Sequence, residues 1–108
     1  MPIIDDAKLD DLRKAVGSSF ELMMNLFRES AREEFDALRS ALAGGDTVTM
    51  RRAAHTLKGV AANLGANRIQ VIARRIEVVA ADPAAVERLL EPLDRAIEIT
   101  ASRIGELV

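Results

Sequence analysis

The amino-acid sequence predicts an all-α protein, specifically an antiparallel up-down-up-down four-helix bundle with a short extra N-terminal helix. Apolar residues recur at three- and four-residue steps along most of the chain. Glycine and proline divide these stretches into segments of helical length. No stretch alternates apolar and polar residues as a half-buried strand does, so no sheet is expected.

The first predicted helix is short and spans about Asp6 to Val16. Leu9 and Leu12 are spaced to pack on a bundle, and Gly17 follows as a left-handed stop.

The second predicted helix, from about Ser19 to Ala43, carries a long apolar stripe that includes all three phenylalanines. Such a stripe could line a cofactor slot. We interpret it as core, because burying large side chains is what stabilises a small bundle. Its members are Phe20, Met23, Phe27, Ala31, Phe35, Leu38 and Leu42.

The third predicted helix runs from about Thr47 to Leu64, between an Asp46 N-cap and a Gly65 stop. Its apolar face comprises Met50, Ala53, Ala54, Leu57, Ala61 and Leu64.

Two further helices complete the predicted bundle. We expect Asn67 to cap the fourth, and Asp82, with Pro83 at the first helical position, to open the fifth. Their apolar positions are Ile69, Ile72, Ile76 and Val79 in the fourth, and Val86, Leu89, Leu93, Ile97 and Ile104 in the fifth.

Length and composition favour one folded domain over residues 1–108. With 49% hydrophobic and 30% charged residues, the chain differs from disordered sequences, and no apolar run approaches the ~20 residues that span a bilayer. The opening MPIIDDAKLDD lacks the basic start and apolar stretch of a secretory signal, so a cytoplasmic location without membrane attachment is expected.

Residue types also limit the chemistry. The chain has no cysteine and one histidine, His55, so disulfides, thiolate catalysis and multi-histidine metal centres are excluded. We expect neither a metal nor another cofactor on this chain.

The net charge of -2 hides a basic stretch between residues 51 and 75 that contains no Asp or Glu. Such a stretch suits nucleic acid, phosphate or an acidic protein surface. Nucleic acid is not expected as a partner, because the whole chain is acidic and has no Trp or Tyr for base stacking. The cations are Arg51, Arg52, Lys58, Arg68, Arg74 and Arg75.

The position of His55 on its helix points away from the core. At about 100° per residue, the apolar side chains cluster within roughly ±60° of Leu57, whereas His55 falls at about 160°. Gly59 lies one turn later, where glycine lowers helix stability by roughly 0.5 to 1 kcal/mol relative to alanine. A need for clearance around an incoming group would explain a glycine at this position.

The same region provides positive charge that could bind a phosphoryl group. Lys58 lies one turn from His55, and Arg51 or Arg52 could assist from the preceding turn. A neutral, exposed imidazole can attack phosphorus without a separate base.

Other phosphate chemistries fit less well. No carboxylate shares the arc of His55 on its helix, so a catalytic triad and hydrolysis by this chain alone are not expected. No glycine-rich phosphate loop is present, so we expect no ATP-binding or kinase domain and no enzyme activity of that kind.

The segment from Ala53 to Gly65, AAHTLKGVAANLG, closely resembles the signature H-x-L-K-G-[SA]-[AS]-x-x-[LI]-G of the histidine-containing phosphotransfer (HPt) domain. Chain length and helix order are also similar. Val60 stands where the family often has Ser or Ala, at the margin of the core face.

The resemblance implies a phosphoprotein that carries a phosphoryl group on His55 Nε2 between receiver-domain aspartates in a two-component phosphorelay. It implies that Lys58 steadies the group and that Gly59 keeps the ring accessible. The expected partners are response-regulator receiver domains, which would supply Mg²⁺, with a hybrid histidine kinase as a further candidate.

By the same analogy, a receiver docks over the second and third helices. Leu22 and Leu26 lie off the phenylalanine stripe and would form an exposed apolar contact near His55, unless they pack at its flank. Arg51, Arg52 and Ala62 complete the expected partner-binding set.

Two other classes remain open. The dimerisation and phosphoacceptor region of a histidine kinase also carries its histidine on a helix, but usually with an acid directly after it and a nearby proline. Here Thr56 follows, and the chain supplies four long helices itself, which favours a monomer. The second class is a structural or adaptor bundle in which His55 is incidental.

Overall fold

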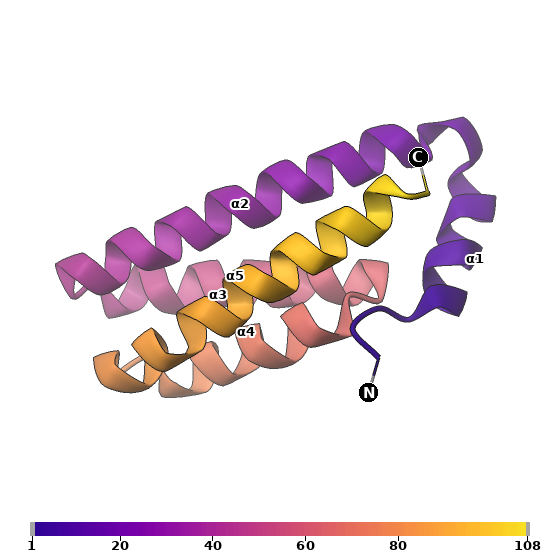
Figure 1. Ribbon diagram of the computed structural model, residues 1–108. Coiled ribbons are helices and arrows are strands. Elements are labelled where there is room, and N and C mark those ends of the chain that lie inside the picture. Colours follow the sequence, from indigo (N-terminus) through magenta and orange to yellow (C-terminus); the bar gives the residue numbers. More distant parts are fainter. Residues whose placement is uncertain (1, 108) are drawn as a thin grey trace.

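The computed structural model describes residues 2–107, and every regular element in this range is a helix (Figure 1). The α-helices are α1 (Asp6–Val16), α2 (Phe20–Gly44), α3 (Thr47–Leu64), α4 (Asn67–Val79) and α5 (Pro83–Gly105), with a 3₁₀ turn, η1 (Gly17–Ser19), between the first two. Among residues 2–107, none of the helices combines the length and the hydrophobicity that a membrane span requires.

The four longer helices surround one core. α3 packs between α2 and α4, and α5 packs against both α4 and α2, so the α4–α5 side lies opposite the α2–α3 side. Helix α1 lies across one end of the bundle, where α2 begins and α3 ends (Figure 1).

Several helix boundaries fall where the sequence predicts them. Asp46 caps α3 by accepting a hydrogen bond from the Thr49 N–H at 3.0 Å, and Asp82 caps α5 through the Ala85 N–H at 3.3 Å. Gly17 and Gly65 both have positive φ, at 56° and 73°.

The predicted Asn67 cap is wrong, because α4 already begins at Asn67 and its N-cap position is Ala66, which makes no side-chain capping bond. The connection from α3 is too short to leave Asn67 outside the helix. The Ala66 N–H still bonds the Ala61 carbonyl at the end of α3, and the Asn67 N–H bonds the Gly65 carbonyl at 2.9 Å.

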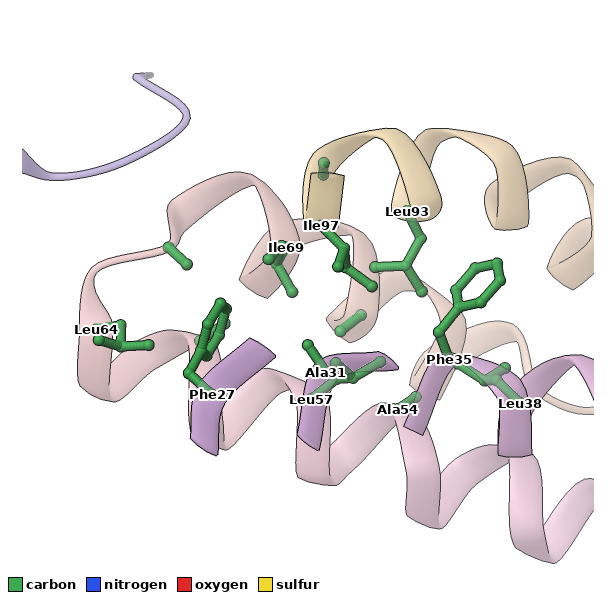
Figure 2. Close-up of a cluster of buried hydrophobic side chains, with 14 of the residues drawn as sticks. Phe27, Ala31, Phe35, Leu38, Ala54, Leu57, Leu64, Ile69, Leu93 and Ile97 are labelled. Carbon is green, nitrogen blue, oxygen red and sulfur yellow. The ribbon is translucent and has the colours of Figure 1, made fainter. Parts of the chain in front are cut away.

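Side chains from all four long helices meet in the core, where Phe27 and Phe35 of α2 lie among aliphatic groups (Figure 2). The predicted stripe of α2 is confirmed as core except at two positions. Met24 is fully buried, whereas Met23 is 36% exposed, because at about 100° per residue position 24 lies nearer than position 23 to the middle of the buried stripe. Near the helix end, Ala41 is buried and Leu42 only half-buried.

The N-terminal segment is tied to the turn between α3 and α4. The Asp5 N–H donates to the Gly65 carbonyl at 2.8 Å, and the Arg68 N–H donates to the Ile3 carbonyl at 3.2 Å. Lys8 Nζ donates to the carbonyl of Ala62 in the last turn of α3 at 2.6 Å. The end of α3 is therefore held by a segment about 60 residues away in sequence.

Candidate functional site

His55 lies on the outer face of α3, and its side chain is 67% exposed. Ala54 and Leu57 on either side of it are buried in the core. The exposure predicted from the helical wheel is confirmed.

A carboxylate from the neighbouring helix holds the ring. Glu77 of α4 places Oε2 2.7 Å from His55 Nδ1, and its Oε1 accepts a hydrogen bond from Lys58 Nζ at 2.6 Å. One carboxylate thus joins the histidine and the lysine.

No carboxylate of α3 itself lies beside His55, as expected, but an acid from another helix reaches the ring, which the sequence did not predict. The wheel compared residues within one helix, whereas Glu77 comes from α4, which packs along α3. One sequence feature marked it: Glu77 is the single acid in an otherwise basic helix and directly follows the buried Ile76.

The electrostatics of the Glu77–His55 pair determine which ring nitrogen carries the hydrogen. The hydrogen bond from Lys58, supported by that from His55, lowers the pKa of Glu77 below its ordinary value, while partial burial acts in the opposite direction. An ionised carboxylate only accepts hydrogen bonds, so Nδ1 of His55 must donate. In the neutral ring this leaves the lone pair on Nε2.

Lys58 does not point freely into solvent. Its side chain is 29% exposed and its ammonium group is paired with Glu77. The lysine predicted to steady a phosphoryl group thus lies beside the ring, and its ammonium group is bound to the same carboxylate as the ring.

Gly59 is exposed, and a methyl group added to it would meet nothing within 4 Å. Packing therefore gives no reason for glycine in the middle of α3. The open space beside His55 agrees with the clearance interpretation.

The predicted partner-binding residues occupy two regions. Leu22 and Leu26 are 62% and 55% exposed, and Leu26 lines a groove of about 540 Å³ between α2 and α3, together with Val60 and Asn63. This groove lies one to two turns beyond His55 along α3. The flank-packing alternative for both leucines is disfavoured by their exposure.

The remaining predicted contacts lie on α3 itself. Arg51 and Arg52 are exposed in the turn before His55, and neither forms an ion pair within residues 2–107. Ala62 is half-buried, and its carbonyl is occupied by Lys8.

The fold divides the basic stretch between two faces. Lys58 lies beside His55, whereas Arg74 and Arg75 line a groove between α4 and α5, and Arg68 lines a second hollow between the same helices. Of the basic stretch, Arg51, Arg52 and Lys58 share α3 with the histidine.

Comparisons with known proteins indicate the family and the fold. The family model described as the Hpt domain matches residues 22–100. The fold is similar to the crystal structure of histidine-containing phosphotransfer protein B (HptB) from Pseudomonas aeruginosa PAO1, with a TM-score of 0.92 and 24% identity, covering 97% of this chain and 93% of that one. No match was found among curated proteins.

Proposed function

Since this chain belongs to the Hpt domain family, whose members perform histidine phosphotransfer in phosphorelays, we propose that His55 is its phosphoryl-accepting residue. His55 is the only histidine in the sequence. The observation that carries the proposal is the bond between its Nδ1 and Glu77, which leaves Nε2 available on an exposed face.

The chemistry follows from that arrangement. The Nε2 lone pair attacks the phosphorus of a receiver's aspartyl phosphate, the N–P bond forms, and the P–O bond breaks with its electrons returning to the aspartate. The proton on Nδ1 stays in place, so the phosphorylated ring is cationic. Glu77 stabilises that cation and keeps the ring oriented, and the reverse sequence passes the group to the next receiver.

Lys58 and Gly59 have complementary parts in this proposal. When a phosphoryl group occupies Nε2, the ammonium of Lys58 can turn from Glu77 to a phosphoryl oxygen only a few ångströms away. Gly59 leaves the approach to Nε2 open, since any side chain there would project beside the ring.

We place the receiver over α2 and α3. Leu22 and Leu26 would supply apolar contact along the α2–α3 groove, and Arg51 and Arg52 would meet the acidic pocket of the receiver. Ala62 would lie at the edge of this interface. The receiver would contribute the Mg²⁺ that the transfer requires.

Hpt proteins are phosphoryl carriers and not kinases, and they work with receiver domains and histidine kinases. We propose that residues 1–108 act as one such carrier domain without its own ATP-binding unit, as a cytoplasmic monomer that binds neither membrane nor nucleic acid. The short connections between α2, α3, α4 and α5 support the antiparallel up-down-up-down order, with α1 as an addition outside the four-helix bundle.

The direct test is transfer from a ³²P-labelled receiver. We expect acid-labile labelling of the wild type and none of His55→Gln, with an unchanged helical circular dichroism spectrum. Labelling of the variant would place the phosphoryl group elsewhere. Absence of labelling of the wild type by every receiver and kinase of the host would favour the adaptor alternative.

A further inference from the structure

A groove with an apolar floor lies between α4 and α5, on the side of the bundle opposite the α2–α3 groove. It encloses about 570 Å³. Its floor includes Val79 and Leu89, and two strongly exposed valines, Val71 at 45% and Val78 at 75%, stand along it. Val71 and Val78 are seven residues apart and therefore share one face of α4.

Three arginines surround this floor. Arg74 and Arg75 occupy the turn between the two valines, and Arg88 faces them from α5. All three are exposed, and within residues 2–107 none forms an ion pair. By contrast, Arg32 pairs with Asp94 and Arg95 pairs with Glu91.

Receiver docking at His55 does not account for this surface. Glu77, which reaches His55, projects from α4 about 100° away from the direction of Val78 around the helix axis. Arg75 lies about 160° from Glu77 around the same axis, and Arg74, about 60° from Glu77, also lines the groove. A partner on α2 and α3 would leave this side of the bundle uncovered.

We propose that the α4–α5 groove binds an acidic amphipathic helix of a partner protein. Apolar side chains at intervals of three and four residues would fill the floor, and flanking Asp or Glu side chains would pair with Arg74, Arg75 and Arg88. Arginine beside an apolar surface is the composition typical of protein interfaces.

The surroundings favour a helix over an anionic membrane surface. The site is a hollow between two helices, into which the ridge of a third helix fits and a flat bilayer does not. The adjoining hollow is mixed in charge, because Glu87 and Glu91 lie there beside three arginines, and a protein helix can match such a pattern whereas a uniformly anionic surface cannot. A protein helix can avoid that end of the groove by the placement of its own charges.

The test uses a designed peptide of about 18 residues, long enough to hold a helix, with leucines at three- and four-residue intervals flanked by glutamates. A scrambled peptide of the same composition is the control. We expect the designed peptide to shift the amide NMR signals of Val71, Arg75, Val78 and Leu89 in a saturable manner. The scrambled peptide should bind far more weakly.

Variants separate the two parts of the site. The double change Arg75→Glu and Arg88→Glu should weaken binding by about tenfold or more, and Val78→Ser by a similar factor. The matched control Arg39→Glu, an exposed arginine on α2, should leave the affinity unchanged. None of these variants should alter phosphotransfer by His55, so failure here is distinguishable from failure of the proposed function.

Four outcomes would overturn the proposal. The first is that the two peptides bind equally well, and the second is that the designed peptide shifts only NMR signals of α2 and α3. The third is that the protein co-sediments with vesicles of phosphatidylglycerol and phosphatidylcholine and that the double variant abolishes this. The fourth is self-association of the wild type, by sedimentation equilibrium, that the double variant abolishes. The last two would assign the groove to a lipid surface or to a second copy of the chain.

Discussion

Glu77 and His55 are 22 residues apart in sequence and belong to different helices, yet Oε2 of the first lies 2.7 Å from Nδ1 of the second. The same carboxylate receives Lys58. Glu77 therefore controls the orientation of the ring and the position of the nearest cation at once.

Removing this carboxylate should slow phosphotransfer without unfolding the protein. We expect Glu77→Ala to reduce the transfer rate by about ten- to a hundredfold, because the ring loses its orientation and its cation loses a counter-charge. Glu77→Gln should lose less, since an amide oxygen can still accept from Nδ1. Glu33→Gln, on the exposed surface of α2, serves as control.

A spectroscopic measurement separates orientation from mere structure. Long-range ¹⁵N–¹H NMR of the neutral wild-type ring should find the hydrogen on Nδ1. In Glu77→Ala the ring should exchange between both tautomers. A wild-type ring with its hydrogen on Nε2 would contradict the proposed nucleophile.

The Glu77 carboxylate should also make stability depend on pH. Its pKa is lowered in the folded state, so its contribution is fully present above the unfolded-state pKa and is lost as the pH falls through the folded-state value. The wild type should exceed Glu77→Gln in unfolding free energy at pH 7, and the difference should shrink as the pH falls below 4.5, the ordinary pKa of a glutamate. Urea unfolding of both proteins across this range measures it. A difference that grows on acidification would contradict the assignment.

Gly59→Ala should stabilise α3 and slow transfer. The added methyl group meets open space, so helix propensity alone acts and the free energy of unfolding should rise by about 0.5 to 1 kcal/mol. Transfer should slow, and more strongly in Gly59→Leu, as the approach to the ring is crowded. Gly44→Ala is the matched control, because its position is also open and lies far from His55 along the chain. Unchanged transfer in Gly59→Leu would refute the clearance role.

Gly65 should tolerate substitution less well than Gly45. Both have positive φ, at 73° and 68°, but a Cβ on Gly65 would lie 3.1 Å from Asp5 Cβ and 3.2 Å from Lys8 Cβ, whereas one on Gly45 meets nothing. We expect Gly45→Ala to cost about 1 kcal/mol from backbone conformation, and Gly65→Ala to cost at least about 2 kcal/mol. Thermal unfolding of both variants tests this, and equal losses would mean that the N-terminal segment yields easily.

Thr100 should be better replaced by valine. Its side chain is 1% exposed, and its hydroxyl has no hydrogen-bond partner within the described residues. Thr100→Val keeps the shape and removes the desolvated group, so the free energy of unfolding should rise by about 1 kcal/mol. Thr49→Val should do the opposite, since the Thr49 hydroxyl donates to Asp46 at 2.6 Å. A loss of stability in Thr100→Val would indicate that a bound water satisfies the hydroxyl.

Properties set within one helix could be predicted from the sequence. The bounds of α3, its Asp46 cap, its Gly65 stop and the exposure of His55 all follow from local spacing and capping chemistry. Properties set between helices could not. The short α3–α4 connection displaced the cap from Asn67 to Ala66, and the pairing of α3 with α4 brought Glu77 to His55. A helical wheel contains no information on which neighbouring helix faces a given residue.

The division of the site between α3 and α4 makes the oriented histidine a product of tertiary folding. A synthetic peptide with the sequence of residues 47–65 would contain the whole matched signature, including Lys58 and Gly59, but would lack the hydrogen-bond acceptor that the other helix supplies to His55. Its imidazole would have no fixed orientation. Competence as a phosphoryl acceptor should thus disappear together with cooperative unfolding of the bundle, which makes transfer activity a sensitive reporter of correct refolding.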